Sequence, residues 1–185
     1  MEYIGYILLG LVVVIVFWMI GAYNSLVSLR NRVDEAFSTM DVYMVKRADL
    51  IPNLVETVTG YAKHESETLE KVIAARNAAV GSKTIDEKAT NEASFQGALG
   101  RLFALAESYP DLKANVNFMD LQGQLKVVEE DIAQSRKYYN GSTWEYNTTL
   151  ERFPTKLIAG MFGVKRRPLF EVTDEAQRQN VKVQF

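Results

Sequence analysis

Residues 3–23 read YIGYILLGLVVVIVFWMIGAY and contain no charged side chain. A helix needs about 20 apolar residues to cross the ~30 Å hydrocarbon core of a bilayer, and this stretch supplies 21. Aromatic side chains, which favour the headgroup level, lie toward both ends of the stretch: Tyr3, Tyr6, Trp18 and Tyr23. We therefore expect residues 1–23 to form a transmembrane anchor in an otherwise water-exposed protein.

A cleaved signal peptide is the alternative interpretation of the same residues. Such a peptide has a basic N-terminal region, a shorter apolar core and a cleavage site of small residues. Met1 and Glu2 supply no basic side chain. The only small residues near the end of the apolar run are Gly21 and Ala22. The pattern favours a retained anchor.

Basic residues follow the anchor but do not precede it. The first ones after the apolar run are Arg30, Arg32, Lys46 and Arg47. Because basic residues near the ends of a membrane helix remain in the cytoplasm, we expect a single-pass protein whose soluble part is cytoplasmic and whose N-terminus lies outside.

The composition excludes several classes of function. The chain has 185 residues, a net charge of −2, no cysteine and one histidine. A protein that binds nucleic acid usually carries a basic stripe, so we expect no nucleic-acid partner. Disulfide scaffolds, thiolate metal sites and thiol catalysis all need cysteine. A ferritin-type di-iron site needs a second histidine beside His64.

Helical periodicity resumes directly after the anchor. Apolar residues recur every three or four positions from Ala22 to Met44, and no Pro or Gly occurs between Ala22 and Pro52. This spacing predicts a helix that continues from the membrane into the soluble part. We expect a second helix to begin at Asp49 as its N-cap, with Pro52 in its first turn, and to end near Gly81.

Two further helices complete the predicted bundle. Thr84 and Glu87 have the spacing of a capping box, and Ser108–Asp111 ends the helix that they begin. The fourth helix carries apolar residues from Leu112 to Leu150 and contains Gly123 and Gly141. Four amphipathic helices joined by short breaks predict an all-α protein, with an antiparallel four-helix bundle over residues 24–152.

Residues 153–185 change in character. A short apolar segment, 153–164, is followed at once by Lys165, Arg166 and Arg167. An apolar helix beside basic residues can lie on an anionic membrane surface, so Lys156 and these three residues are candidate membrane-surface contacts. The alternative is that the apolar side chains cap the end of the bundle: Leu157, Ile158, Met161 and Phe162.

The sequence contains no recognisable catalytic set. It has no Gly-rich phosphate loop and no Gly-x-Ser-x-Gly elbow. We therefore predict no catalytic, cofactor-binding or metal-binding residue. Five aromatic residues cluster in and after the fourth helix, and they form either part of the core or an exposed patch for a partner: Tyr138, Tyr139, Trp144, Tyr146 and Phe153.

Several motifs resemble those of the LemA family. The most specific is the run 46–58, KRADLIPNLVETV. Other matching motifs are distributed over most of the chain: Tyr23–Val27, Val33–Ala36, Tyr61–Glu65, Ala75–Arg76, Tyr109–Asn115, Tyr139–Asn140, Glu145–Asn147, Phe153–Pro154 and Leu157–Gly160. The resemblance implies a bacterial, single-pass inner-membrane protein with a long helical bundle, without enzymatic activity and without a cofactor. It also makes the signature run a candidate contact surface, formed by Lys46, Arg47, Asp49, Pro52 and Asn53.

Two functions agree with these observations. The first is a non-enzymatic membrane scaffold that binds the bilayer and further copies of itself. The second is an accessory subunit of a membrane enzyme such as a metalloprotease, because LemA family members are often encoded near membrane metalloproteases. One branch of the family serves magnetosome membranes, which by analogy favours the first.

Overall fold

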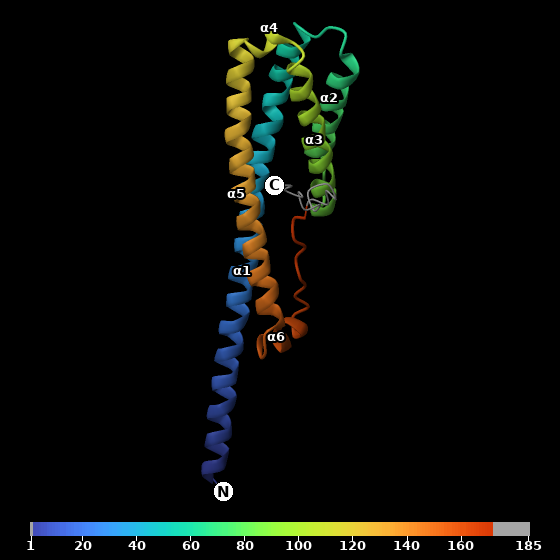
Figure 1. Cartoon of the computed structure of the whole chain (residues 1–185). Coiled ribbons are helices and arrows are strands. Elements are labelled where there is room, and N and C mark those ends of the chain that lie inside the picture. Colours follow the sequence, from blue (N-terminus) through green and yellow to red (C-terminus); the bar gives the residue numbers. More distant parts are fainter. Residues whose placement is uncertain (1, 172–185) are drawn as a thin grey trace, which may run out of the picture. The chain divides into compact units, whose positions relative to one another are not determined.

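The computed structural model describes residues 2–171, which form six α-helices and no β-strand (Figure 1). The helices are α1 (Glu2–Thr59), α2 (Ser66–Gly81), α3 (Ile85–Ala106), α4 (Pro110–Lys113), α5 (Val116–Glu151) and α6 (Thr155–Met161). The expected all-α class is confirmed for this part of the chain. Residues 172–185 of the predicted tail lie outside the described residues.

The boundary between the first two predicted helices is wrong. Asp49 is not an N-cap, because α1 continues through it and through Pro52 to Thr59. The chain leaves the helix at Gly60, and α2 begins only at Ser66. A proline inside a helix removes one backbone hydrogen bond, so tertiary contacts have to hold this part of α1.

The other helix ends agree more closely with the sequence. Thr84 caps α3 in a complete capping box, in which the Glu87 N–H donates to Thr84 Oγ1 and the Thr84 N–H donates to the Glu87 carboxylate. α5 begins at Val116 rather than Leu112, because the short α4 precedes it, and it includes both Gly123 and Gly141.

The chain divides into two compact units. Of the described residues, the anchor unit contains 2–38 and 137–169, and the core unit contains 39–136 and 170–171. Helices α1 and α5 therefore contribute residues to both units. The predicted division of the chain at residues 23/24 and 152/153 remains a prediction.

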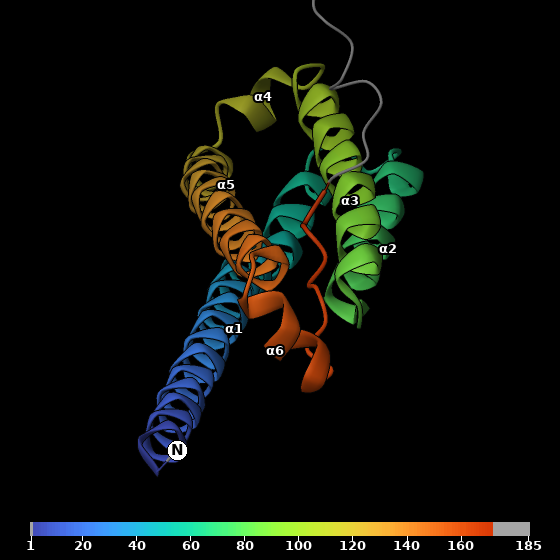
Figure 2. The ribbon, with the colours of Figure 1, turned by 90° about the horizontal axis from the view of Figure 1, so that it is seen from below.

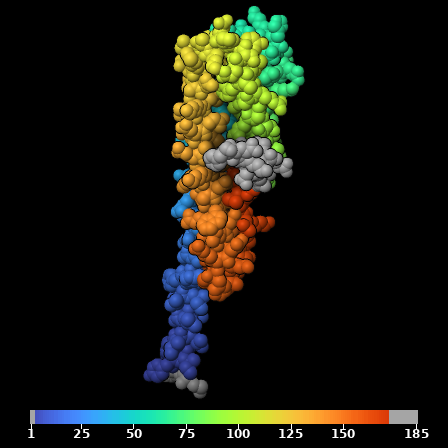
Figure 3. Space-filling view, in the orientation of Figure 1, coloured from blue at the N-terminus to red at the C-terminus, as the bar shows by residue number. Residues whose placement is uncertain are grey.

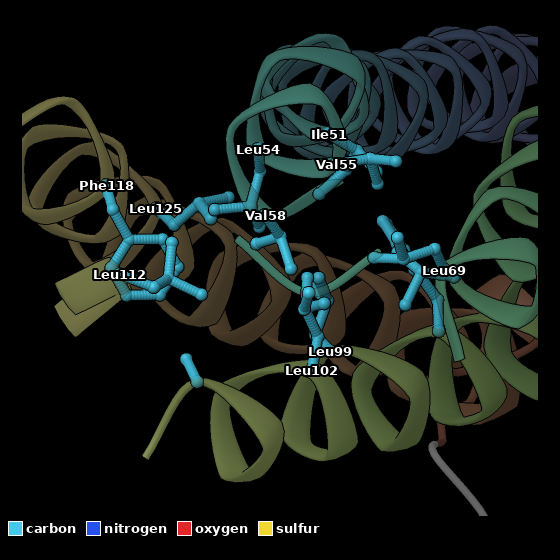
Figure 4. Close-up of a cluster of buried hydrophobic side chains, with 14 residues drawn as sticks. Ile51, Leu54, Val55, Val58, Leu69, Leu99, Leu102, Leu112, Phe118 and Leu125 are labelled. Atoms are coloured by element: carbon cyan, nitrogen blue, oxygen red, sulfur yellow. The ribbon is translucent and has the colours of Figure 1, made fainter. Parts of the chain in front are cut away.

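The core unit is built around one apolar cluster, shown in Figure 4. Its side chains come from α1, α2, α3, α4 and α5, among them Leu54, Val72, Leu102, Leu112 and Leu125. Burying one such side chain contributes about 1.5–3 kcal/mol relative to leaving it in water. This cluster supplies the packing that keeps the last turns of α1 helical around Pro52.

The anchor unit has its own core, which begins well inside α1. Its buried side chains include Leu26 and Val33 of α1, Tyr146 and Leu150 of α5, and Ile158 of α6. Residues 3–18 of α1 are exposed, and Figure 3 shows the start of α1 as a bare blue surface beyond the orange end of α5 and α6. Within the described residues, α1 alone is long and apolar enough to cross a membrane.

Candidate functional site

The signature residues of α1 separate into an exposed stripe and one buried charge. Lys46, Asp49, Pro52 and Asn53 are exposed, and their spacing places them on one face of the helix. Arg47 is only 1% exposed. Its assignment to a contact surface is wrong, because it points into the core unit from the opposite side of α1.

Arg47 joins three helices through two carboxylates. Its guanidinium donates to both oxygens of Glu92 on α3, at 2.7 and 2.5 Å, and to Glu129 Oε1 on α5 at 2.9 Å. The Phe95 ring lies 4.5 Å from its Cζ atom, a favourable cation–π distance. A bidentate pair has a fixed geometry, so this cluster orients α1, α3 and α5 around one point.

The second arginine of the cluster is less completely paired. Arg136 Nη2 lies 3.6 Å from Glu92 Oε1, and its guanidinium lies over the Phe170 ring at 5.1 Å. Burial lowers the pKa of Arg136, and the nearby charge of Arg47 lowers it further, while Glu92 and Glu129 oppose this shift. Burial also opposes the charged form of Arg47, but hydrogen bonds and charges from Glu92 and Glu129 raise its pKa. Glu92 and Glu129 therefore stabilise the charged form of Arg47 more than that of Arg136.

Pro52 leaves a backbone acceptor that another helix satisfies. In an uninterrupted helix the Ala48 carbonyl accepts a hydrogen bond from the N–H of residue 52, and proline has none. Arg76 of α2 donates its Nε–H to this carbonyl at 3.2 Å, and its Nη2 lies 3.6 Å from Asp49 Oδ1. Two signature motifs, around Pro52 and at Arg76, thus meet in one structural contact.

Sequence reasoning missed the partners of these residues. Glu92 and Arg136 were not singled out by any motif rule, and Arg76 was noted only as part of the matching motif Ala75–Arg76. One signal was available for Glu92, because it lies on the apolar stripe of α3 between Ala89 and Phe95. A charge on such a stripe needs a buried partner.

A groove runs along the core unit between α3 and α5. It has a volume of about 640 Å³ and is lined mainly by apolar residues and two glycines, Leu99, Gly100, Phe103, Met119, Gly123 and Leu125. A Cβ atom added at Gly100 or Gly123 meets nothing within 4 Å. The groove is therefore open enough to admit an apolar side chain of a partner.

In the anchor unit, α5 holds the segment that follows α6. The Tyr139 and Tyr146 hydroxyls donate to the carbonyls of Pro168 and Lys165 at 2.8 and 3.1 Å. Asn147 exchanges two hydrogen bonds with the backbone of Arg167, at 2.8 and 2.9 Å. Burial raises the pKa of Tyr146, so the hydroxyl remains a donor. These motif residues fasten the segment 165–168 to α5.

The aromatic cluster predicted on α5 is divided between core and surface. Tyr139 and Tyr146 are buried, as the core interpretation predicted. Tyr138, Trp144 and Phe153 are exposed, Trp144 to 63%. The core interpretation is therefore correct for Tyr139 and Tyr146, and a partner patch at the exposed residues remains a prediction.

The four candidate membrane contacts differ in how they are paired. Arg167 binds Asp34 of α1 at 3.1 Å, and Arg166 binds Glu151 at 2.9 Å. Lys156 and Lys165 are exposed and form no ion pair among the described residues. Their ammonium groups remain available to an anionic surface.

Among residues 2–171, no three His, Asp or Glu side chains gather in a way that could hold a metal ion. His64 is exposed in the turn before α2.

Residues 36–185 match the profile of the LemA family. Protein LemA of Metamycoplasma hominis is 25% identical over 162 residues, which cover 85% of this chain and 73% of that protein. Magnetosome protein MamQ of Magnetospirillum gryphiswaldense is 26% identical over 174 residues, covering 80% of this chain and 64% of that protein. Magnetosome protein MamQ 2 of Paramagnetospirillum magneticum is 26% identical over 175 residues, with the same coverage. This chain thus spans slightly less than two thirds of each MamQ protein.

Proposed function

The chain belongs to the LemA family, and from this premise we propose that it is a non-enzymatic, membrane-anchored helical scaffold that assembles with copies of itself. The coarser part of this statement, a membrane-associated helical protein, follows from the family and from the apolar start of α1. Assembly and the scaffold role are the proposal.

The observation that carries the proposal is the double role of α1. Its first turns are apolar and exposed, whereas its last turns supply Ile51, Leu54 and Val58 to the core unit. One helix thus belongs both to the anchor and to the folded part. We propose that α1, α2, α3 and α5 form a four-helix bundle on this anchor, at the cytoplasmic side of a bacterial inner membrane.

Exposed apolar side chains support contacts between copies. Trp144, Tyr138 and Val127 of α5 and Val42 and Val45 of α1 are all exposed outside the apolar start of α1. Trp144 is 63% exposed, and tryptophan is enriched among residues that dominate binding between proteins. Anchoring in one membrane raises the effective concentration of copies, so weak contacts suffice.

Single-particle imaging of the full-length protein in mild detergent tests the assembly. We expect particles with several copies in closed symmetry. Trp144→Ser should reduce the fraction of assembled particles, and Lys137→Ser, at another exposed α5 position, is the matched control. A protein that remains monomeric in detergent and in lipid at high concentration contradicts the proposal.

An adaptor for a membrane enzyme is the second candidate. The open apolar groove between α3 and α5 favours it, because such a groove can receive a partner segment. Met119→Lys places a charge at an exposed position of the groove and should abolish a complex that depends on it. Purification from native membranes that returns no enzyme with the wild-type protein contradicts this candidate.

A further inference from the structure

We propose that α6 is a membrane-contact helix that lies in the headgroup layer beside the anchor, with its outer apolar side chains inserted between lipids. The occupant of this surface is an anionic phospholipid bilayer. The inference rests on the proposed anchoring of α1 and adds a second, peripheral contact with the same membrane.

The first argument is the position of α6 along α1. Figures 1 and 2 both show α6 directly after the end of α5. The Phe162 ring at the end of α6 packs on Tyr23, with ring centroids 4.6 Å apart. Tyr23 is the residue at which the apolar stretch 3–23 ends, so a bilayer spanned by that stretch has its surface at the level of α6.

The second argument is the division of α6 into two faces. Ile158 and Ala159 are buried against the rest of the anchor unit. Phe153, Leu157 and Met161 follow one another at intervals of four residues and are 80, 59 and 70% exposed. Leu157 and Met161 lie four residues apart within α6 and share a helix face, and Phe153 lies in the turn directly before α6. These three exposed side chains are the apolar row. Exposure of this apolar row to water is unfavourable, and insertion into a bilayer would remove the row from water.

The third argument is charge. Lys156 and Lys165 are exposed and lack ion-pair partners among residues 2–171, and in the sequence Lys156 directly precedes Leu157 while Lys165 follows the end of α6. Basic residues near an anionic leaflet contribute about 1 kcal/mol each. An apolar row flanked by free ammonium groups is the pattern of an interfacial helix, whereas the core of a contact between copies is depleted of lysine.

Site-specific fluorescence in the full-length protein tests the proposal. The chain has no cysteine, so Leu157→Cys or Met161→Cys gives one labelled position. The labelled protein is reconstituted in vesicles of phosphatidylglycerol and phosphatidylethanolamine that contain a phospholipid with a nitroxide quencher near the headgroup. We expect quenching at both positions.

Two control positions separate this inference from the proposed anchoring. Tyr138→Cys is exposed on α5 in the same unit and should remain unquenched. Val13→Cys lies inside the apolar stretch and should be quenched by a nitroxide deeper in the acyl chains. If the label at position 13 is quenched but the labels at positions 157 and 161 are as little quenched as the label at position 138, the membrane contact of α6 is wrong and the anchoring by α1 is supported. If Val13 is also unquenched, the anchoring itself fails.

The last test varies the charge of the lipid and the concentration of the protein. Lys156→Gln and Lys165→Gln should each lower the ratio of lipid-bound to free α6 about fivefold in anionic vesicles, but not in phosphatidylcholine. Lys137→Gln is the matched control, and arginine at positions 156 and 165 should restore binding. If the label at α6 responds to protein dilution but not to the charge of the lipid, the occupant of this surface is a second copy of the chain, and the proposal is overturned.

Discussion

At the scale of single residues, the core unit depends on one buried charge. Arg47 has the largest side chain among the fully buried residues, and its guanidinium contacts carboxylates on α3 and α5. Burying two charges costs several kcal/mol per ion, which the ion pairs only offset when their geometry is good. The bidentate contact with Glu92 provides that geometry.

Arg47→Met should lower the free energy of unfolding by about 3–5 kcal/mol, because the buried Glu92 carboxylate loses its bidentate partner and keeps only the longer contact with Arg136 at 3.6 Å. Urea denaturation in mild detergent, followed by circular dichroism, measures the change. Lys46→Met at the neighbouring exposed position should change it by less than about 0.5 kcal/mol.

The double variant Arg47→Met/Glu92→Leu separates the charge from the packing. It should recover part of the loss, since no unpaired carboxylate remains buried. An Arg47→Met protein as stable as the Lys46→Met control contradicts the role given to the cluster.

At the scale of helices, Pro52 and Arg76 form a coupled pair. A proline in a helix interior costs about 3 kcal/mol, and Arg76 reduces this cost by satisfying the Ala48 carbonyl. The buried side chains Ile51 and Leu54 on either side of Pro52 hold the backbone in place. The helix therefore persists where local sequence favours a boundary.

Arg76→Met should destabilise the protein by about 1–3 kcal/mol, because the Ala48 acceptor, in a buried residue, loses its donor. In a Pro52→Ala background the same change should cost less, since the restored backbone N–H bonds to Ala48 instead. Urea denaturation of the four proteins gives the coupling energy.

Asp49→Asn is the control for the remaining contact of Arg76, and its effect should be small because Asp49 is exposed. Equal costs of Arg76→Met in both backgrounds contradict this account of the carbonyl.

The capping box of α3 predicts a dependence on pH. Backbone N–H groups of Lys83 and Thr84 lower the pKa of Glu87 from its ordinary value of 4.5. A lowered folded-state pKa adds stability above 4.5, and this stability is lost as the pH falls through the lowered value. Wild-type protein should exceed Glu87→Gln in urea midpoint at neutral pH, and the difference should narrow in acid.

Glu70, exposed on α2, supplies the control for this titration. Glu70→Gln should leave the urea midpoint at neutral pH close to that of wild type. A constant difference between wild type and Glu87→Gln across the acid range contradicts the cap's contribution.

At the scale of the whole molecule, the decisive property is orientation in the membrane. No basic residue precedes the apolar stretch, and Arg30 and Arg32 follow it. Cysteine placed at Tyr138 should resist a membrane-impermeant maleimide in intact spheroplasts and react after permeabilisation. Cysteine placed at Tyr3 should react before permeabilisation. The opposite labelling pattern contradicts a cytoplasmic soluble part.

The sequence by itself determined the features that depend on neighbouring residues. The apolar stretch 3–23, the capping box at Thr84 and the helical class all follow from composition and spacing over a few turns. Local rules also placed a helix start at Asp49, and this was wrong because the rule contains no information about Arg76, which is 24 or more residues away in sequence.

Only the tertiary structure decided which polar residues are buried and what they hold. In the sequence, Lys46 and Arg47 are simply two adjacent basic residues, but in the structure Arg47 is buried and Lys46 is exposed. The difference arises because Glu92 and Glu129 meet α1 on one side, and Tyr139, Tyr146 and Asn147 likewise find their acceptors only after segment 165–168 has folded back along α5. A hydrogen bond or ion pair between distant segments exists only once packing has brought them together, and packing follows from the whole set of buried surfaces rather than from any one motif.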